Sequence, residues 1–261
     1  EGEYIEPYFY IPILPIILIN GSQGIGTGYS CSIPSFNPND IKDNIMRILD
    51  GKETIEMIPW YNGYKGKIIK KDVGSFVING IVEKVTSNSI RITDIPVGVS
   101  IDEYSQFIET LIDDNAYGIV NSINNSNEIE INILLEFSGN SLEEFLKNGK
   151  ENILKILKLS RPLSTRNMHL FDINGSIKKY ETADDILKEF VNIRILYNTK
   201  RKEYLINKYT DDLKIIRNKY RFLNEIISGD MVVYKKSKIT IEEELETRKY
   251  YKSEDNFDYL L

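Results

Sequence analysis

Apolar residues recur at helical spacing across residues 182–228. The residues that step by three and four are Ile186, Phe190, Ile193 and Tyr197 and then, after one weak joint near Arg201, Leu205, Tyr209, Leu213, Ile216, Tyr220, Leu223 and Ile227. No proline or glycine interrupts this segment, so it is predicted to be one helix of roughly 70 Å at 1.5 Å per residue. A narrow apolar seam with charges elsewhere requires a partner helix, which we expect beyond Leu261 or on another chain.

Before this helix, the pattern alternates between strands and helices. The predicted strands are 67–71, 75–85, 89–95, 128–137, 168–171 and 177–180. Helices are predicted from Asn39-Asp40 to about Asp50, over 101–113, and from Ser141, where Ser-Leu-Glu-Glu matches a capping box. Residues 1–39 are expected to be extended chain and turns, and residues 229–261 broken, polar and partly β-like. This succession predicts an α+β fold.

Composition places the chain among ordinary globular proteins, with 41% hydrophobic and 28% charged residues. The longest apolar run, 11–19, is broken by two prolines and is too short to span a bilayer. A single cysteine, Cys31, and a single histidine, His169, exclude an intramolecular disulfide and give no zinc pattern, which favours a reducing compartment. No signal peptide is apparent, and the start at Glu1 indicates an internal fragment.

The distribution of charge is more informative than its total. A net charge of −6 argues against a protein that coats DNA by bulk electrostatics. Residues 7–39 carry no charged side chain, whereas the balance over 60–95 is positive and the predicted long helix carries many basic residues interleaved with acids. The acidity is therefore expected on solvent faces and in the C-terminal stretch.

The uncharged segment holds four glycines within eight positions: Gly21, Gly24, Gly26 and Gly28. Glycine permits positive φ and close approach of a ligand to the backbone, and successive free N–H groups can hold a phosphate. Ile25, between two glycines, is predicted at a loop tip with nothing in the chain to bury it. An exposed aliphatic side chain at such a tip suits a wedge that unstacks base pairs and kinks a duplex.

Other interpretations of this loop compete with the wedge. A dinucleotide-binding fingerprint requires a third glycine where Tyr29 stands, after Gly24 and Gly26. A phosphate-binding P-loop requires Gly-Lys-Ser/Thr, and no lysine is nearby. On physical grounds alone, a turn whose Ile25 packs inward is as well supported as the wedge.

Sequence motifs resolve the matter by resemblance. The segments E-P-Y-F-Y-I-P-I-L-P (6–15), L-I-N-G-S-Q-G-I-G-T-G-Y-S (18–30) and I-P-S-F-N-P (33–38) resemble the eukaryotic and large-virus type IIA DNA topoisomerases. Further similarity lies at 59–68, 92–96, 168–172, 178–180, along the long helix and at 257–261. G-T-G at 26–28 differs from the A-V-G of bacterial gyrase and topoisomerase IV subunits, which favours the eukaryotic or viral branch. Tyr8, Phe9 and Tyr29 replace the family's usual acid and tryptophans.

The resemblance implies roles for individual residues. Ile25 matches the isoleucine that intercalates into bent DNA, and the implied DNA-binding residues are Gln23, Gly24, Gly26, Thr27, Ser30, Lys65 and Lys67. Thr27 and Ser30 have an alternative role, in which their hydroxyl groups cap the loop. Lys65 and Lys67 have an alternative role as solvated edge-strand residues that discourage aggregation.

The resemblance also implies an organisation and an activity. Residues 1–55 match the second half of a winged-helix region, 56–181 a tower domain, 182–228 a coiled-coil helix, and 229–261 the start of the region leading to a dimer gate. The implied enzyme is a homodimer that uses ATP and Mg²⁺ to pass one DNA duplex through a double-strand break in another.

Within that family, the cleaving tyrosine, the magnesium carboxylates and the ATP site lie outside the segment matched here. No catalytic or metal-binding residue is therefore assigned to this chain. Its implied location is the nucleus, or the cytoplasm of an infected cell or a virion for a viral protein, with no membrane association. Two other functions remain as hypotheses: a non-enzymatic coiled-coil scaffold with a β-rich head, and a nucleotide-dependent enzyme that uses the glycine loop.

Overall fold

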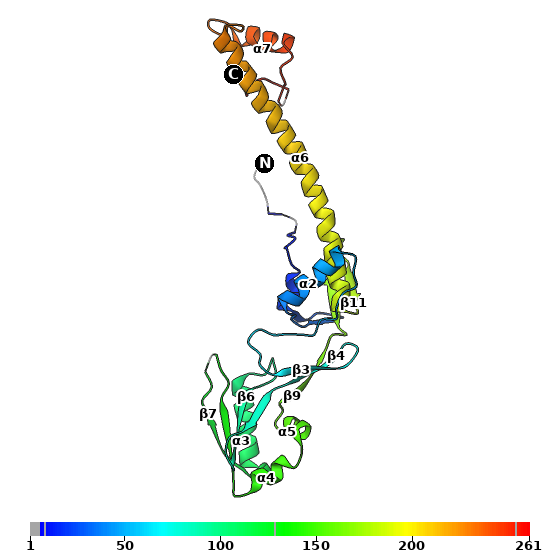
Figure 1. Ribbon diagram of the computed structural model, residues 1–261, viewed down its shortest axis with the longest axis vertical. Coiled ribbons are helices and arrows are strands. Elements are labelled where there is room, and N and C mark those ends of the chain that lie inside the picture. Colours follow the sequence, from blue (N-terminus) through cyan, green and yellow to red (C-terminus); the bar gives the residue numbers. More distant parts are fainter. Residues whose placement is uncertain (1–5, 8, 128, 254) are drawn as a thin grey trace. The chain divides into compact units, whose positions relative to one another are not determined.

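The computed structural model describes residues 6–7, 9–127, 129–253 and 255–261 (Figure 1). The chain divides into two compact units, Glu1–Ile193 and Arg194–Leu261. Helix α6, Ala183–Ser228, contributes its first residues to the first unit and the remainder to the second. Helices and antiparallel strands occur together, which confirms the predicted α+β class.

One hydrophobic core of the first unit joins residues near the start of the chain to residues around position 170. Its helices and strands are α1 (Ile16–Asn20), β2 (Ser30–Ile33), α2 (Pro38–Leu49), β10 (Met168–Phe171), β11 (Ile177–Tyr180) and the start of α6. Strand β1 (Ser22–Ile25) pairs with β2, but all four of its residues are exposed. Leu18, Ile41 and Met168 are fully buried within the core. The β1–β2 and β10–β11 pairs are separate two-stranded sheets, so each depends on this core for its stability.

A second core of the first unit lies between helices and a four-stranded antiparallel sheet of order β5-β6-β8-β7 (Figure 1). The elements are β5 (Ile81–Lys84), β6 (Ser89–Asp94), β7 (Ile119–Asn124), β8 (Ile133–Phe137), α3 (Ile101–Asp113), α4 (Ser141–Leu146), α5 (Lys150–Ile156) and a short 3-10 helix, Ala116–Gly118. Tyr104 and Ile108, one turn apart on α3, are buried in this core. Ser100 caps α3 by accepting a hydrogen bond from the Glu103 N–H at 3.1 Å.

A three-stranded sheet of order β3-β4-β9 completes the first unit. It consists of β3 (Lys67–Asp72), β4 (Ser75–Asn79) and β9 (Ser160–Ser164). The predicted single strand over 75–85 is wrong, because β4 and β5 belong to different sheets. The chain passes between them at Gly80, where a Cβ atom would lie 2.4 Å from the Asp94 carbonyl oxygen. Glycine allows this close backbone approach, and the continuous run of β-forming residues concealed it.

Several predicted boundaries are confirmed. Helix α3 and strands β10 and β11 have the predicted limits, and α6 begins at Ala183 with Thr182 as its cap. The predicted strand over 128–137 is shorter, since β8 begins at Ile133, and Glu128 lies outside the described residues.

Two predicted helix caps are wrong, although α4 begins at Ser141 as predicted. Helix α2 is capped by Asn37, whose side-chain oxygen accepts from the Asn39 N–H at 2.9 Å, rather than by Asn39-Asp40. Helix α4 follows Asn140 without a side-chain cap, so Ser141 does not form a capping box. The elements not anticipated are α1, β1, β2, the 3-10 helix Ala116–Gly118, β7, α5, β9 and α7 (Lys238–Thr247).

The second unit has its own core, in which Phe222 of α6 packs with Met231, Leu245 and Tyr250. Helix α7, Lys238–Thr247, lies where partly β-like structure was predicted. Its β-branched residues are accommodated because Ser237 caps the helix and Leu245 packs into the core. Within the described ranges, no helix combines the length and apolar character needed to cross a membrane.

Candidate nucleic-acid interface

The glycine-rich segment forms a β-hairpin, residues 22–33, rather than the loop predicted from its composition. Strand β1 pairs antiparallel with β2, and Ile25 lies opposite Ser30 in the last pair before the turn. The Gly26 N–H donates to the Tyr29 carbonyl oxygen at 2.9 Å and closes the tip. Gly28 has φ +98, a conformation that favours glycine and reverses the chain within this short turn.

Ile25 presents its side chain to solvent, with 93% of its surface exposed. The inward-packing interpretation is therefore excluded. Keeping an isoleucine in water forgoes about 1.5–3 kcal/mol that burial would provide. Gly24 and Gly26 on either side have no side chains to cover it, so the fold leaves Ile25 available to an apolar partner.

The hairpin is braced along β2 by the segment that leads into β10. The Ser32 N–H donates to the Asn167 carbonyl oxygen at 2.7 Å, and the Asn167 side-chain amide donates to the Ser30 hydroxyl at 2.6 Å. The Cys31 thiol donates to the His169 carbonyl oxygen at 3.1 Å. These bonds fix one strand while β1 remains exposed, which gives Ile25 a rigid support.

The predicted DNA-binding residues of the hairpin do not share one environment. Gln23 and Gly24 are exposed on β1, and Gly26 and Thr27 are exposed in the turn. Ser30 is half-buried, and its hydroxyl accepts the hydrogen bond from the Asn167 side-chain amide. Tyr8, a departure from the family pattern, lies outside the described residues.

Lys65 and Lys67 lie together at the start of β3, away from the hairpin in sequence. Both side chains are exposed, and β3 is an edge strand of its sheet. The Asp94 carboxylate accepts from the N–H groups of Lys65 and Gly66 at 2.7 and 2.9 Å, which fixes the backbone here. The Lys65 ammonium lies 3.3 Å from a Glu130 carboxylate oxygen. This position is compatible with phosphate contact and with the edge-strand alternative.

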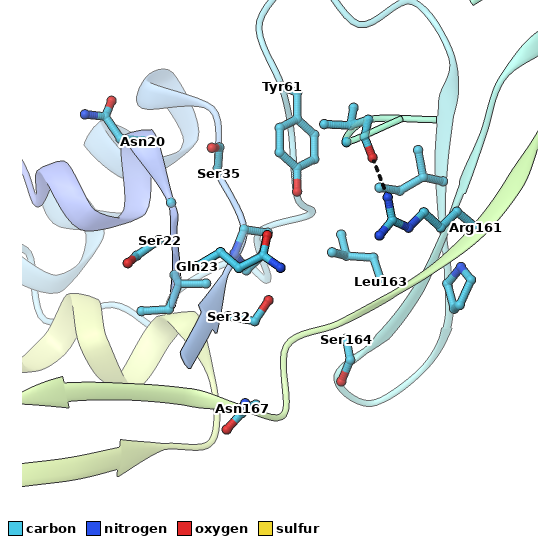
Figure 2. Close-up of a pocket in the computed structure, with 17 residues that line it drawn as sticks. Asn20, Ser22, Gln23, Ser32, Ser35, Tyr61, Arg161, Leu163, Ser164 and Asn167 are labelled. Carbon is cyan, nitrogen blue, oxygen red and sulfur yellow. Dashed lines mark hydrogen bonds between the residues drawn. The ribbon is translucent and has the colours of Figure 1, made fainter. Parts of the chain in front are cut away.

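An open cavity of about 740 Å³ lies between the hairpin and the three-stranded sheet (Figure 2). Gln23 and Ser32 contribute from the hairpin, Arg161 from β9, and Tyr61 from the segment before β3. Burial raises the pKa of Tyr61 above its ordinary value of 10.0, and the positive charge of Arg161 acts in the opposite direction. Tyr61 lies in the 59–68 stretch that resembles the family, but no role was predicted for it. No local sequence motif marks Arg161 or Asn167, so their place in this cavity was not predicted either.

Comparisons with known proteins cover nearly the whole chain. Residues 1–261 match the family model for DNA gyrase/topoisomerase IV. DNA topoisomerase 2 of Arabidopsis thaliana is 39% identical over 252 residues, covering 94% of this chain and 17% of the relative. DNA topoisomerase 2 of Plasmodium falciparum (isolate K1 / Thailand) is 38% identical over 251 residues, covering 96% and 18%. The chain thus spans less than a fifth of the length of these two relatives.

A solved structure agrees with the fold. The crystal structure of the Plasmodium falciparum topoisomerase II DNA-binding, cleavage and re-ligation domain superimposes with a TM-score of 0.87 at 35% sequence identity. The match covers 98% of this chain and 38% of that chain. The arrangement of helices and strands described above is therefore shared with that structure.

Proposed function

Because the chain belongs to the type IIA DNA topoisomerase family, we propose that it is the DNA-binding and DNA-bending part of an enzyme that passes one duplex through a transient double-strand break in another. The observation that carries this proposal is the exposure of Ile25 at the tip of a braced hairpin. An exposed aliphatic side chain on a rigid support is what a wedge between base pairs requires.

Burial of Ile25 alone does not offset the free-energy cost of bending and unstacking DNA. Bending a DNA site by 40–90° costs roughly 1–6 kcal/mol, and unstacking adds a few kcal/mol for each step. Burying Ile25 between bases returns about 1.5–3 kcal/mol. The wedge therefore depends on additional contacts to the DNA backbone, for which Gln23, Thr27, Lys65 and Lys67 are our candidates. Contacts of that kind make the affinity depend on salt.

We assign no chemical step to this chain. In the proposed enzyme, a tyrosine breaks the strand by transesterification with help from Mg²⁺, and ATP drives strand passage. The described residues do not fit a magnesium site, since no group of three His, Cys, Asp or Glu side chains among them could hold a metal ion. We propose that the tyrosine, the metal and the ATP site lie in other parts of the enzyme.

The proposed organisation follows the family. Residues 1–55 would complete a winged-helix region, 56–181 would form a tower domain, 182–228 a coiled-coil helix, and 229–261 the start of the path to a dimer gate in a homodimer. The nucleus is the proposed location, although one relative, from Dictyostelium discoideum, is named as mitochondrial. A coiled-coil scaffold without enzymatic function is not favoured, because the relatives are topoisomerases.

The proposal is tested by Ile25→Ala in the intact protein. We expect DNA bending, measured by energy transfer between dyes on the duplex ends, and DNA cleavage to fall at least tenfold, since loss of about 1.4 kcal/mol is tenfold in an equilibrium. ATP hydrolysis without DNA should not change. Ile239→Ala, which alters an isoleucine that is 69% exposed on α7, is the matched control and should bend and cleave normally. Normal bending and cleavage by Ile25→Ala would refute the wedge.

A further inference from the structure

The cavity beside the hairpin has an unusual charge balance for an acidic chain. Of the 17 residues drawn in Figure 2, Arg161 is the single charged one, and none is an aspartate or a glutamate. The other polar groups are hydroxyls and amides of serine, tyrosine, asparagine and glutamine side chains. A cavity lined by one cation and neutral hydrogen-bonding groups favours an anion over a cation or a neutral ligand.

The Arg161 guanidinium has most of its donors unused. Its one hydrogen bond within the described residues is to the Val97 carbonyl oxygen at 3.5 Å, and no carboxylate in that part of the chain lies within ion-pair distance. Arg166, five residues later, differs in each respect. Its guanidinium lies 3.3 Å from the Asp72 carboxylate and donates twice to the Val73 carbonyl oxygen, at 3.0 and 3.2 Å.

Neutral groups face Arg161 across the same space. Figure 2 shows Gln23 of β1 and Arg161 of β9 reaching toward the cavity from facing walls, with Ser32 and Asn167 below them. The walls are tied together, since the Trp60 N–H donates to the Ser35 carbonyl oxygen at 2.8 Å. A planar guanidinium opposite an amide can hold two oxygens of one phosphate. The volume also lies within the range of ligand-binding pockets.

We propose that this cavity binds a backbone phosphate of the duplex that the hairpin bends, with Arg161 as its principal ligand. The inference rests on the proposed function and adds to it a binding site for one phosphate of the bent duplex. Gln23 precedes Ile25 by two residues, about 7 Å along a strand. That length is comparable to the rise of about two base pairs, so a phosphate held against Gln23 would lie close to the step that Ile25 opens.

The test compares Arg161→Gln with the matched control Arg166→Gln in the intact protein. Duplex affinity is measured from 50 to 200 mM salt. Loss of one phosphate contact lowers the slope of log K against log salt by about 0.9, which corresponds to about eightfold weaker binding at 0.1 M. We expect this change for Arg161→Gln and an unchanged slope for Arg166→Gln. Arg161→Lys should keep the wild-type slope, because lysine binds phosphate as a point charge.

Failure of this inference is distinguishable from failure of the proposed function. A wild-type slope for Arg161→Gln, in a protein that binds the duplex, overturns the inference and leaves the wedge intact. Titration with inorganic phosphate shows whether the cavity is instead a site for free anions. If phosphate binding depends on Arg161 but Arg161→Gln does not change duplex affinity, the inference is also overturned. Absence of salt-sensitive duplex binding by the wild-type protein would instead refute the proposed function.

Discussion

Two isoleucines on the same hairpin have opposite environments. Ile33, at the end of β2, is 3% exposed and belongs to the hydrophobic core, whereas Ile25, at the end of β1, is 93% exposed. The difference arises from position, because the base of the hairpin packs on α1 and α2 and the tip extends from them. A fold that buries the isoleucine at the base of the hairpin and exposes the one at its tip leaves the second available to a partner.

Gly21 and Gly24 provide a matched pair for the stability of the hairpin. Gly21 has φ +69, and a Cβ there would lie 2.6 Å from the Ile33 carbonyl oxygen, whereas a Cβ at Gly24 meets nothing within 4 Å. We expect Gly21→Ala to lower the free energy of unfolding by roughly 1–3 kcal/mol, and Gly24→Ala to change it by less than about 0.5 kcal/mol. Urea unfolding measures both, and equal effects would show that Gly21 is not constrained.

The site was predictable from the sequence to the extent that its residues are neighbours in the chain. The spacing of glycines around Ile25 is a local signal, and it identified the hairpin tip. Asn167 and Arg161 carry no such signal. Asn167 binds Ser30 across 137 positions, and Arg161 reaches the cavity through the pairing of β9 with β4. Periodicity within a segment contains no information on which distant segments will pair.

Among the elements, α6 is determined by a local sequence pattern, whereas the hairpin strands depend on contacts with distant segments. The seam of α6 repeats over many turns, so its helix was predicted almost to the residue. Strands β1 and β2 have four residues each and include glycine and serine, which are poor strand formers. Their pairing depends on the bonds to Asn167 and His169, and these tertiary contacts override local preference.

The seam of α6 can be tested by single substitutions. Ile216 on the seam is 61% exposed, and Ile206 off the seam is 53% exposed. If the seam packs on a partner helix in the intact protein, Ile216→Glu should lower stability by about 1.5–3 kcal/mol, while Ile206→Glu should have little effect. Thermal unfolding of the intact protein measures the difference. Equal stability of the two variants would contradict the partner helix.

The second unit should show a defined response to acid. Burial alone would raise the pKa of Glu225, but its ion pairs with Arg221 and Arg248, at 2.7 and 3.0 Å, hold that pKa below its ordinary value of 4.5. A carboxyl with a lowered pKa stabilises the fold above the unfolded-state pKa, and this contribution is lost as pH falls through the folded-state pKa.

Glu225→Gln should therefore lower the thermal midpoint at pH 7 and flatten its fall below about pH 4.5. Glu243→Gln, at an exposed position on α7, is the control and should follow the wild-type curve. Thermal melts from pH 7 to pH 3 provide the measurement. An unchanged pH profile for Glu225→Gln would show that the two arginines do not stabilise the unit through this carboxylate.

At the scale of the whole molecule, the proposed function requires an acidic chain of net charge −6 to bind a polyanion. We infer that it does so by local means: an uncharged hairpin, exposed lysines at the start of β3, and a cavity whose one charge is positive. Non-specific attraction is weak in such a design, so binding depends on geometry around the hairpin. In the proposed enzyme, breakage and strand passage are assigned to residues other than those that the structure describes.

Entry of Ile25 into the base stack can be observed through the fluorescence of a base in that stack. A fluorescent base analogue that brightens on unstacking is placed at successive steps of a short duplex, and the intact protein is added. We predict a rise at one defined step with the wild-type protein and none with Ile25→Ala, at concentrations where both variants are bound. The same rise with both proteins would contradict entry of Ile25 into the stack, as would an unchanged signal at every step with the wild type.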